Sequence, residues 1–209
     1  MSIDRILSSV ESYYTGKITL HGPCAMGVDW SSSESQLLRF DRLLFAWDRG
    51  APFTLNDYGC GYGALLDFLS DRGIQCSYRG FDLSPALIEQ ARKLHGKHPS
   101  CSFSCRESEL APADYTVASG LFNVKMETTD DEWQMYMKET IDKLAGLSML
   151  GFAFNALTSY SDRERRRPDL YYADPLFWFD YCKTRFSRFV ALLHDYPLYD
   201  FTIIVRMEG

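Results

Sequence analysis

The chain has 209 residues, of which 46% are hydrophobic and 15% aromatic, so it can fold around a substantial core. Its formal net charge of −6 argues against a general nucleic-acid partner. The first residues carry charges where a signal peptide needs an apolar run, and the apolar stretch from Leu144 to Leu157 is too short to span a bilayer. Six cysteines without C-x-x-C spacing indicate reduced thiols. We expect a cytoplasmic protein with no nucleic-acid or membrane partner.

The first fifty residues are predicted to form a helical cap. Apolar residues recur with helical spacing over about 3–15, and Gly16 is expected to end this helix. A loop at 17–32 precedes a second helix, for which Ser33 and Gln36 form a candidate capping box. The predicted buried face of the second helix consists of Leu37, Leu38, Phe40, Leu44 and Trp47.

Strand-like and helix-like patterns alternate from residue 53 onward, which predicts an α/β fold. The expected strands are 53–58, 76–81, 101–106, 114–119, 149–156, 189–194 and 201–206. The expected helices are 62–71, a helix from Ser84 that stops before Gly96, one opened by a capping box of Thr129 and Glu132, and 174–186. The link between the last two strands is too short for a crossover helix, so these strands should be antiparallel.

Residues 53–63, Phe-Thr-Leu-Asn-Asp-Tyr-Gly-Cys-Gly-Tyr-Gly, are the most informative stretch of the chain. Glycines at alternate positions let the backbone turn sharply and approach a ligand that a β-carbon would repel. A second strand-like run ends in Asp82. A glycine turn followed at this distance by an acid is typical of a crevice that binds a nucleoside.

The run from Asp57 to Gly63, together with Asp82 and the C-terminal hairpin, resembles the class I S-adenosylmethionine-dependent methyltransferases over about residues 53–209. The resemblance implies a Rossmann-like methyltransferase fold with a seven-stranded, mostly parallel sheet, one antiparallel C-terminal strand and helices on both faces. It implies one domain, 1–209, with the helical cap at 1–50 and the core at 51–209.

A nicotinamide-binding interpretation stays open, because Gly59, Gly61 and Ala64 also fit the pattern G-x-G-x-x-A. Three features favour the methyltransferase: the acid before the first glycine, the third glycine at Gly63, and the terminal hairpin. Because the G-x-G-x-x-A match remains, a nicotinamide-linked reductase is a third functional hypothesis.

The resemblance implies S-adenosylmethionine as cofactor and S-adenosylhomocysteine as product. Asp57 would face the cofactor's ammonium group or an ordered water, or else cap the amides of the glycine turn. Asp82 would accept the ribose hydroxyls, or else cap the helix that follows. Glu107, for which Glu109 is the alternative, would accept the adenine amino group. The other implied cofactor contacts are Gly59, Cys60 as a space-filler, Gly61, Gly63, Leu83, Ser108, Ser119, Gly120 and Leu121.

Transfer of a methyl group from a sulfonium needs alignment and desolvation, and sometimes a base. His194 and His21 are candidates for that base, whereas His95 and His98 are expected at the opposite edge of the sheet. The candidate acceptor pocket consists of Tyr14, Trp30, Asn123 and Tyr172, although the aromatic residues could instead pack the cap onto the sheet, and ordinary turn chemistry could explain Asn123 and residues 119–121.

The predicted function is methyl transfer to an oxygen or nitrogen of a small-molecule acceptor, without a metal. The alternative is a non-catalytic protein that binds S-adenosylmethionine as a regulator or partner subunit. The arginine-rich segment 158–170 either attracts an acidic acceptor or is a solvated loop.

Overall fold

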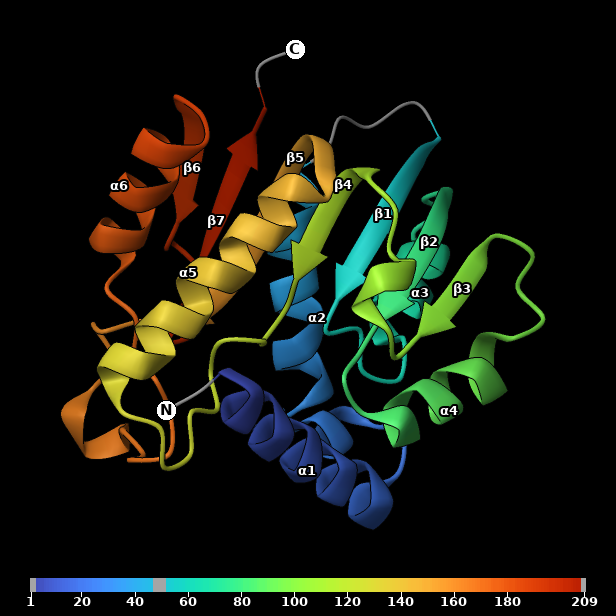
Figure 1. Ribbon diagram of the computed structural model, residues 1–209, viewed down its shortest axis with the longest axis horizontal. Coiled ribbons are helices and arrows are strands. Elements are labelled where there is room, and N and C mark those ends of the chain that lie inside the picture. Colours follow the sequence, from blue (N-terminus) through green and yellow to red (C-terminus); the bar gives the residue numbers. More distant parts are fainter. Residues whose placement is uncertain (1–2, 47–51, 208–209) are drawn as a thin grey trace.

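A computed structural model describes residues 3–46 and 52–207, and its centre is one seven-stranded sheet (Figure 1). The strand order is β3-β2-β1-β4-β5-β7-β6, and only β7 runs antiparallel to its neighbours. The strands are β1 (Phe53–Tyr58), β2 (Cys76–Phe81), β3 (Cys101–Ser104), β4 (Ala113–Ala118), β5 (Ser148–Leu157), β6 (Phe189–Leu193) and β7 (Asp200–Arg206). The predicted α/β fold with an antiparallel C-terminal strand is confirmed.

Helices cover both faces of the sheet. They are α1 (Ile3–His21), α2 (Ser33–Leu43), α3 (Ala64–Asp71), α4 (Pro85–His95), α5 (Asp130–Gly146) and α6 (Pro175–Arg185). One core cluster joins the sheet to α1, α5 and α6, and the other joins it to α2, α3 and α4. Figure 1 shows α5 and α6 in front of the strands and α2 behind them. The near-continuous apolar run of β5 reflects this two-sided cover.

Local sequence signals set several of these boundaries. Ser84 is the N-cap of α4, with its hydroxyl accepting the Leu87 N–H, and Pro85 occupies the first helical position. Thr129 and Glu132 form the predicted capping box of α5. The bounds predicted for the first two strands of the sheet agree with the structure because each strand lies between clear turn residues.

The predictions for the cap region were partly wrong. The first helix continues through Gly16, which is exposed, to His21, because one glycine weakens a helix without ending it. The N-cap of α2 is Ser32, whose hydroxyl accepts the Ser35 N–H at 3.1 Å, so the Ser33–Gln36 capping box is absent.

The buried face of α2 also differs from the prediction. Leu37 is exposed, and Trp47 lies outside the described residues. The residues that α2 buries are Ser35, Gln36, Arg39, Phe40 and Leu43. Polar residues on this face meet polar partners in the fold, which hydrophobic periodicity alone could not anticipate.

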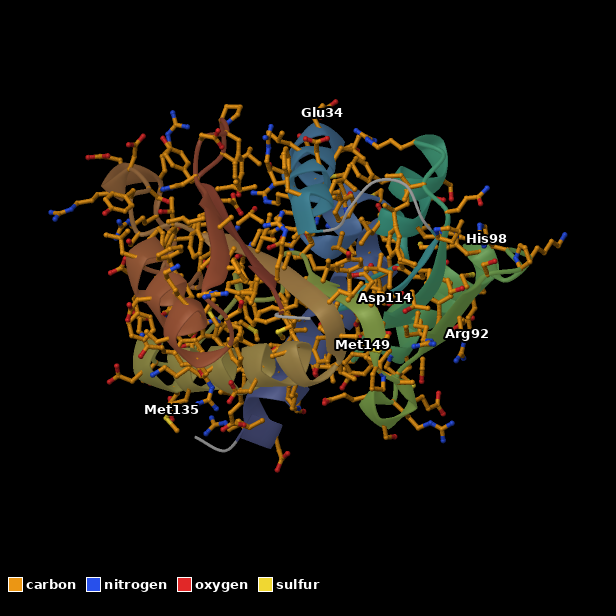
Figure 2. The ribbon with its side chains drawn as sticks, turned by 90° about the horizontal axis from the view of Figure 1, so that it is seen from above. Glu34, Arg92, His98, Asp114, Met135 and Met149 are labelled. Carbon is orange, nitrogen blue, oxygen red and sulfur yellow. The ribbon has the colours of Figure 1, made fainter. Side chains whose placement is uncertain are left out.

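Helix α1 lies across the carboxyl ends of the parallel strands, at the lower edge of the sheet in Figure 1. Figure 2 looks down on the opposite edge, where Asp114 and Met149 lie near the starts of β4 and β5. Among the helices described in residues 3–46 and 52–207, none has the length and apolar character needed to cross a membrane. Of the two helices in the predicted cap, α1 therefore lies over the edge at which open α/β sheets bind ligands, whereas α2 packs on a face of the sheet.

Candidate cofactor and acceptor site

The glycine turn after β1 is folded back onto the end of β2. The N–H groups of Gly59 and Cys60 both donate to the Phe81 carbonyl, at 2.7 and 2.9 Å. Gly63 has a φ of +89°, and a β-carbon there would lie 2.8 Å from the His95 ring, so only glycine fits. The turn therefore presents backbone atoms rather than side chains to the space above it.

His95 supports this turn from beneath, with Nε2 3.2 Å from the Tyr62 carbonyl oxygen. The expectation that His95 lies at the opposite edge of the sheet was therefore wrong. The histidine is buried because α4 packs beside the glycine turn. Figure 2 shows His98 at the outer rim of the molecule.

Asp57, near the end of β1, is 3% exposed and accepts a hydrogen bond of 2.5 Å from the Tyr78 hydroxyl. Burial raises the pKa of Asp57 to about 7, and the charge of Asp82 contributes in the same direction, whereas the Tyr78 hydrogen bond opposes it. Among the described residues, no cationic side chain forms an ion pair with Asp57. The site thus holds a carboxylate that lacks a positive partner.

Asp82 follows β2 and accepts the N–H groups of Gly61 and Ser84, both at 2.9 Å. It therefore ties the glycine turn to the start of α4, while Ser84 supplies the helix cap itself. Desolvation raises the pKa of Asp82 to about 6, although these two hydrogen bonds oppose the shift.

These groups line a first cavity of about 850 Å³, partly open to solvent, between the sheet edge and α1. Nine of the predicted cofactor residues line it: Asp57, Gly59, Cys60, Gly61, Asp82, Leu83, Ser119, Gly120 and Leu121. Buried Cys60 has its pKa raised by desolvation, which fits a space-filling thiol rather than a nucleophile.

Three predicted cofactor residues do not line the first cavity: Gly63, Glu107 and Ser108. The Glu107 carboxylate accepts hydrogen bonds from the Tyr58 hydroxyl at 3.0 Å and from Lys143 at 2.9 Å. Tyr58 itself lines the cavity, so the structure places a tyrosine between Glu107 and this space. Ser108 is exposed.

A second cavity of about 580 Å³, also partly open to solvent, adjoins the first. Tyr14, Val28, Trp30 and Gly120 line both spaces. The remaining residues of the second cavity are Asp29, Ser31, Arg39, Asn123, Val124, Leu157, Arg167 and Leu170. The two cavities are thus adjacent chambers with a common boundary.

The common boundary is formed by Trp30 lying on Gly120. A β-carbon on Gly120 would be 2.3 Å from the Trp30 ring, so the indole occupies the space that a side chain would need. Asn155 of β5 accepts the Gly120 N–H at 2.8 Å and donates to the Ser119 hydroxyl at 3.1 Å. This buried asparagine holds the turn after β4 in place.

The predicted acceptor residues have different positions. Tyr14 and Trp30 line both cavities, and Asn123 lines the second. Tyr172 lines neither cavity, and its hydroxyl accepts the Arg167 N–H at 2.9 Å. Arg167 does line the second cavity, although residues 163–168 are exposed.

Neither candidate base lines either cavity. His194 is exposed beyond β6, the outermost strand, and its ring lies 5.7 Å from that of Tyr160. His21 is the exposed last residue of α1. His194 was expected near the ligand because it follows a strand. That strand, β6, lies at the far edge of the sheet, away from the glycine turn after β1.

The sequence prediction missed part of the first cavity's wall. Leu7, Val10 and Glu11 of α1 line it, as do Tyr58 and Tyr136. The spacing of Leu7, Val10 and Tyr14 predicted one buried helical face, but not that this face covers a cavity.

Comparison with known proteins agrees with this geometry. A family model described as "Methyltransferase domain" matches residues 56–145. The Mycobacterium tuberculosis (strain ATCC 25618 / H37Rv) protein Rv1506c, provisionally named a methyltransferase, is 51% identical over 155 residues, which cover 74% of this chain and 93% of that protein.

Solved structures show the same fold. Magnesium protoporphyrin IX methyltransferase (ChlM) from Synechocystis PCC 6803, with bound SAH, superposes with a TM-score of 0.67 at 12% identity, covering 97% of this chain and 99% of that one. The structure named DhpI-SAH complex gives a TM-score of 0.65 at 14% identity and covers all of both chains. The sequence relative, the fold and the glycine turn with its two acids agree, and the chain belongs to the class I S-adenosylmethionine-dependent methyltransferases.

Proposed function

We propose that the protein transfers a methyl group from S-adenosylmethionine, bound in the first cavity, to an oxygen or nitrogen of a small molecule in the second. The observation that carries this proposal is the pair of carboxylates, Asp57 and Asp82, beside the glycine turn. The adjoining second cavity supplies the separate space that an acceptor needs.

The residues of the first cavity fit this cofactor chemically. The buried Asp57 carboxylate matches an ammonium group, because a positive charge beside it would offset the burial that raises the pKa of Asp57 to about 7. The backbone at Gly59 and Gly61, both with positive φ, leaves room for a ligand to approach closely. The Asp82 carboxylate has lone pairs that the Gly61 and Ser84 N–H groups do not use, and we expect it to accept hydroxyl groups with them.

When bound, S-adenosylmethionine supplies a methyl group on a sulfonium with an activated leaving group. The chain's own residues must then orient both reactants and exclude water. Helix α1 contributes Leu7, Val10 and Tyr14 to that exclusion, because they cover the first cavity. The aromatic faces of Tyr14 and Trp30 can attract a cation by about 0.5–2 kcal/mol.

Calorimetric titration with S-adenosylhomocysteine tests the cofactor site. Asp82→Ala removes the acceptor of the Gly61 and Ser84 N–H groups and should weaken binding about 10-fold or more. Ser84→Ala is the matched control: it removes the cap of α4 and should lower stability by about 1 kcal/mol, with affinity nearly unchanged.

Absence of binding by the unmodified protein at millimolar S-adenosylhomocysteine would refute the cofactor assignment. Binding without methyl transfer to any component of a metabolite extract would support the non-catalytic alternative. A preference for a nicotinamide nucleotide in the same titration would favour the reductase.

A further inference from the structure

We propose that the second cavity selects an acceptor by a carboxylate group, whose oxygen receives the methyl group to give a methyl ester. This inference rests on the proposed function and narrows its choice between oxygen and nitrogen. It is drawn from the side chains that line the second cavity, which offer hydrogen-bond donors and no free base.

Asn123 is the strongest of these observations. It is 5% exposed, lines the second cavity, and its Oδ1 accepts the Leu157 N–H at 3.2 Å. This hydrogen bond fixes the orientation of the amide, so Nδ2 is the group left for a ligand. Within residues 3–46 and 52–207, Nδ2 has no hydrogen-bond partner. Nδ2 is not among the fully buried unpartnered side-chain atoms of the described residues, so it is accessible from the cavity and can donate to an oxygen atom of a ligand.

Two further residues with hydrogen-bond donors, Tyr14 and Trp30, line both cavities. The Trp30 indole N–H has no hydrogen-bond partner among the described residues, and neither has the Tyr14 hydroxyl. Burial raises the pKa of Tyr14, with the charge of Asp29 adding to the shift, so this phenol stays protonated and can donate. Asn123, Tyr14 and Trp30 all line the second cavity and each carries a hydrogen-bond donor, which favours a ligand group that accepts hydrogen bonds.

The carboxylate that lines the second cavity is already engaged. Asp29 accepts hydrogen bonds from Tyr13 at 2.8 Å and from Lys17 at 2.6 Å. Neither His21 nor His194 lines the chamber. An amine, protonated at neutral pH, or an alcohol would need a group to take its proton, whereas a carboxylate is already ionised.

The arginines on the chamber are compatible with an anion and repel an ammonium. Arg39 and Arg167 line it, each paired with an aspartate, Asp200 and Asp169. Because aspartates compensate both arginine charges, the hydrogen-bond donors of Asn123, Tyr14 and Trp30 distinguish a carboxylate from an amine more than the net charge of the cavity does.

The reaction balances without a base. A carboxylate oxygen attacks the methyl carbon, the carbon–oxygen bond forms as the carbon–sulfur bond breaks, and the electron pair of that bond goes to sulfur. The products are a methyl ester and neutral S-adenosylhomocysteine, and no proton is transferred.

Binding of three isosteric probes tests the selection. Protein saturated with S-adenosylhomocysteine is titrated with 3-phenylpropanoate, 3-phenylpropan-1-ol and 3-phenylpropylamine. We expect the carboxylate to bind at least about 10-fold more tightly than the other two, since hydrogen bonds to a charged group are the stronger ones. Equal binding, tighter binding of the alcohol or amine, or no binding of any probe at millimolar concentration would overturn the inference.

Asn123→Asp is the decisive variant. Aspartate retains the oxygen that accepts the Leu157 N–H but replaces the donor by a negative charge. The affinity for 3-phenylpropanoate should fall about 10- to 100-fold, because a donor is lost and like charges meet. Gln75→Glu, the same change at an exposed position, should leave it unaltered. Unchanged affinity in Asn123→Asp would contradict the assignment.

The chemistry of the product gives an independent readout. After incubation with methyl-labelled S-adenosylmethionine and a small-molecule extract, mild alkali should release the label as volatile methanol. Label that resists alkali would refute the ester while leaving methyl transfer intact. Failure of S-adenosylhomocysteine to bind, measured first, would instead refute the proposed function itself.

Discussion

The Arg39 guanidinium in α2 and the Asp200 carboxylate in β7 form a buried ion pair with two hydrogen bonds, at 2.9 and 2.6 Å. The Trp30 ring lies on the same guanidinium, 4.1 Å from its central carbon. Trp30 in turn covers Gly120. A contact between the cap and the last strand thus supports the boundary between the two cavities.

Replacing Arg39 with methionine should destabilise the fold by about 3–5 kcal/mol, because Asp200 would remain as a buried charge without its partner. The double variant Arg39→Met/Asp200→Leu should recover most of this loss. Urea unfolding measures both effects.

The matched control is Arg185→Met, which breaks the exposed, bidentate ion pair with Asp142. It should lower the free energy of unfolding by no more than about 1 kcal/mol. Equal losses at Arg39 and Arg185 would show that burial of the first pair has no energetic consequence.

Asp57→Asn should stabilise the ligand-free protein at pH 8. Burial raises the pKa of Asp57 to about 7, so the folded state retains a proton that the unfolded state loses near pH 4. Stability of the unmodified protein should therefore fall as the pH rises from about 4 to 7, by up to roughly 4 kcal/mol from this group.

Asparagine cannot ionise, so the variant should lack that decline while binding S-adenosylhomocysteine more weakly. Urea unfolding at pH 5 and pH 8, with calorimetry at pH 8, measures both changes. The same pH dependence in both proteins would show that Asp57 is not the group responsible.

Gly120→Ala should disturb the boundary between the cavities. A β-carbon there meets the Trp30 ring and the residue has a φ of +73°, so we expect a loss of about 1–3 kcal/mol and a lower affinity for an acceptor. Adding Trp30→Ala should relieve the steric part of the stability loss, as thermal unfolding would report.

Gly16→Ala is the control for this substitution. Gly16 lies inside α1 with open space around it, so alanine should stabilise the protein by about 0.5–1 kcal/mol. If Gly120→Ala behaved like Gly16→Ala, the contact with Trp30 would have no role in the fold.

The variants His194→Ala and His21→Ala should each retain near-normal turnover, because neither side chain lines a cavity. Steady-state kinetics with the acceptor provide the measurement. A loss of 100-fold or more in kcat with normal thermal stability would restore either histidine as a candidate base.

The strand pattern, the glycine turn, and the acids Asp57 and Asp82 could be predicted from the sequence. Each depends on residues close together in the chain, where hydrophobic period and turn chemistry decide the conformation. The same local signals predicted the helix cap at Ser84.

The shape of the second cavity, the position of His95 beneath the turn, and the contact of Trp30 with Gly120 depended on tertiary structure. Arg39 and Asp200 are 161 positions apart, and no periodicity relates them. Which side chains meet across such separations is decided by how the cap and the last strands pack on the sheet, because packing, unlike turn or strand formation, is a property of the whole fold.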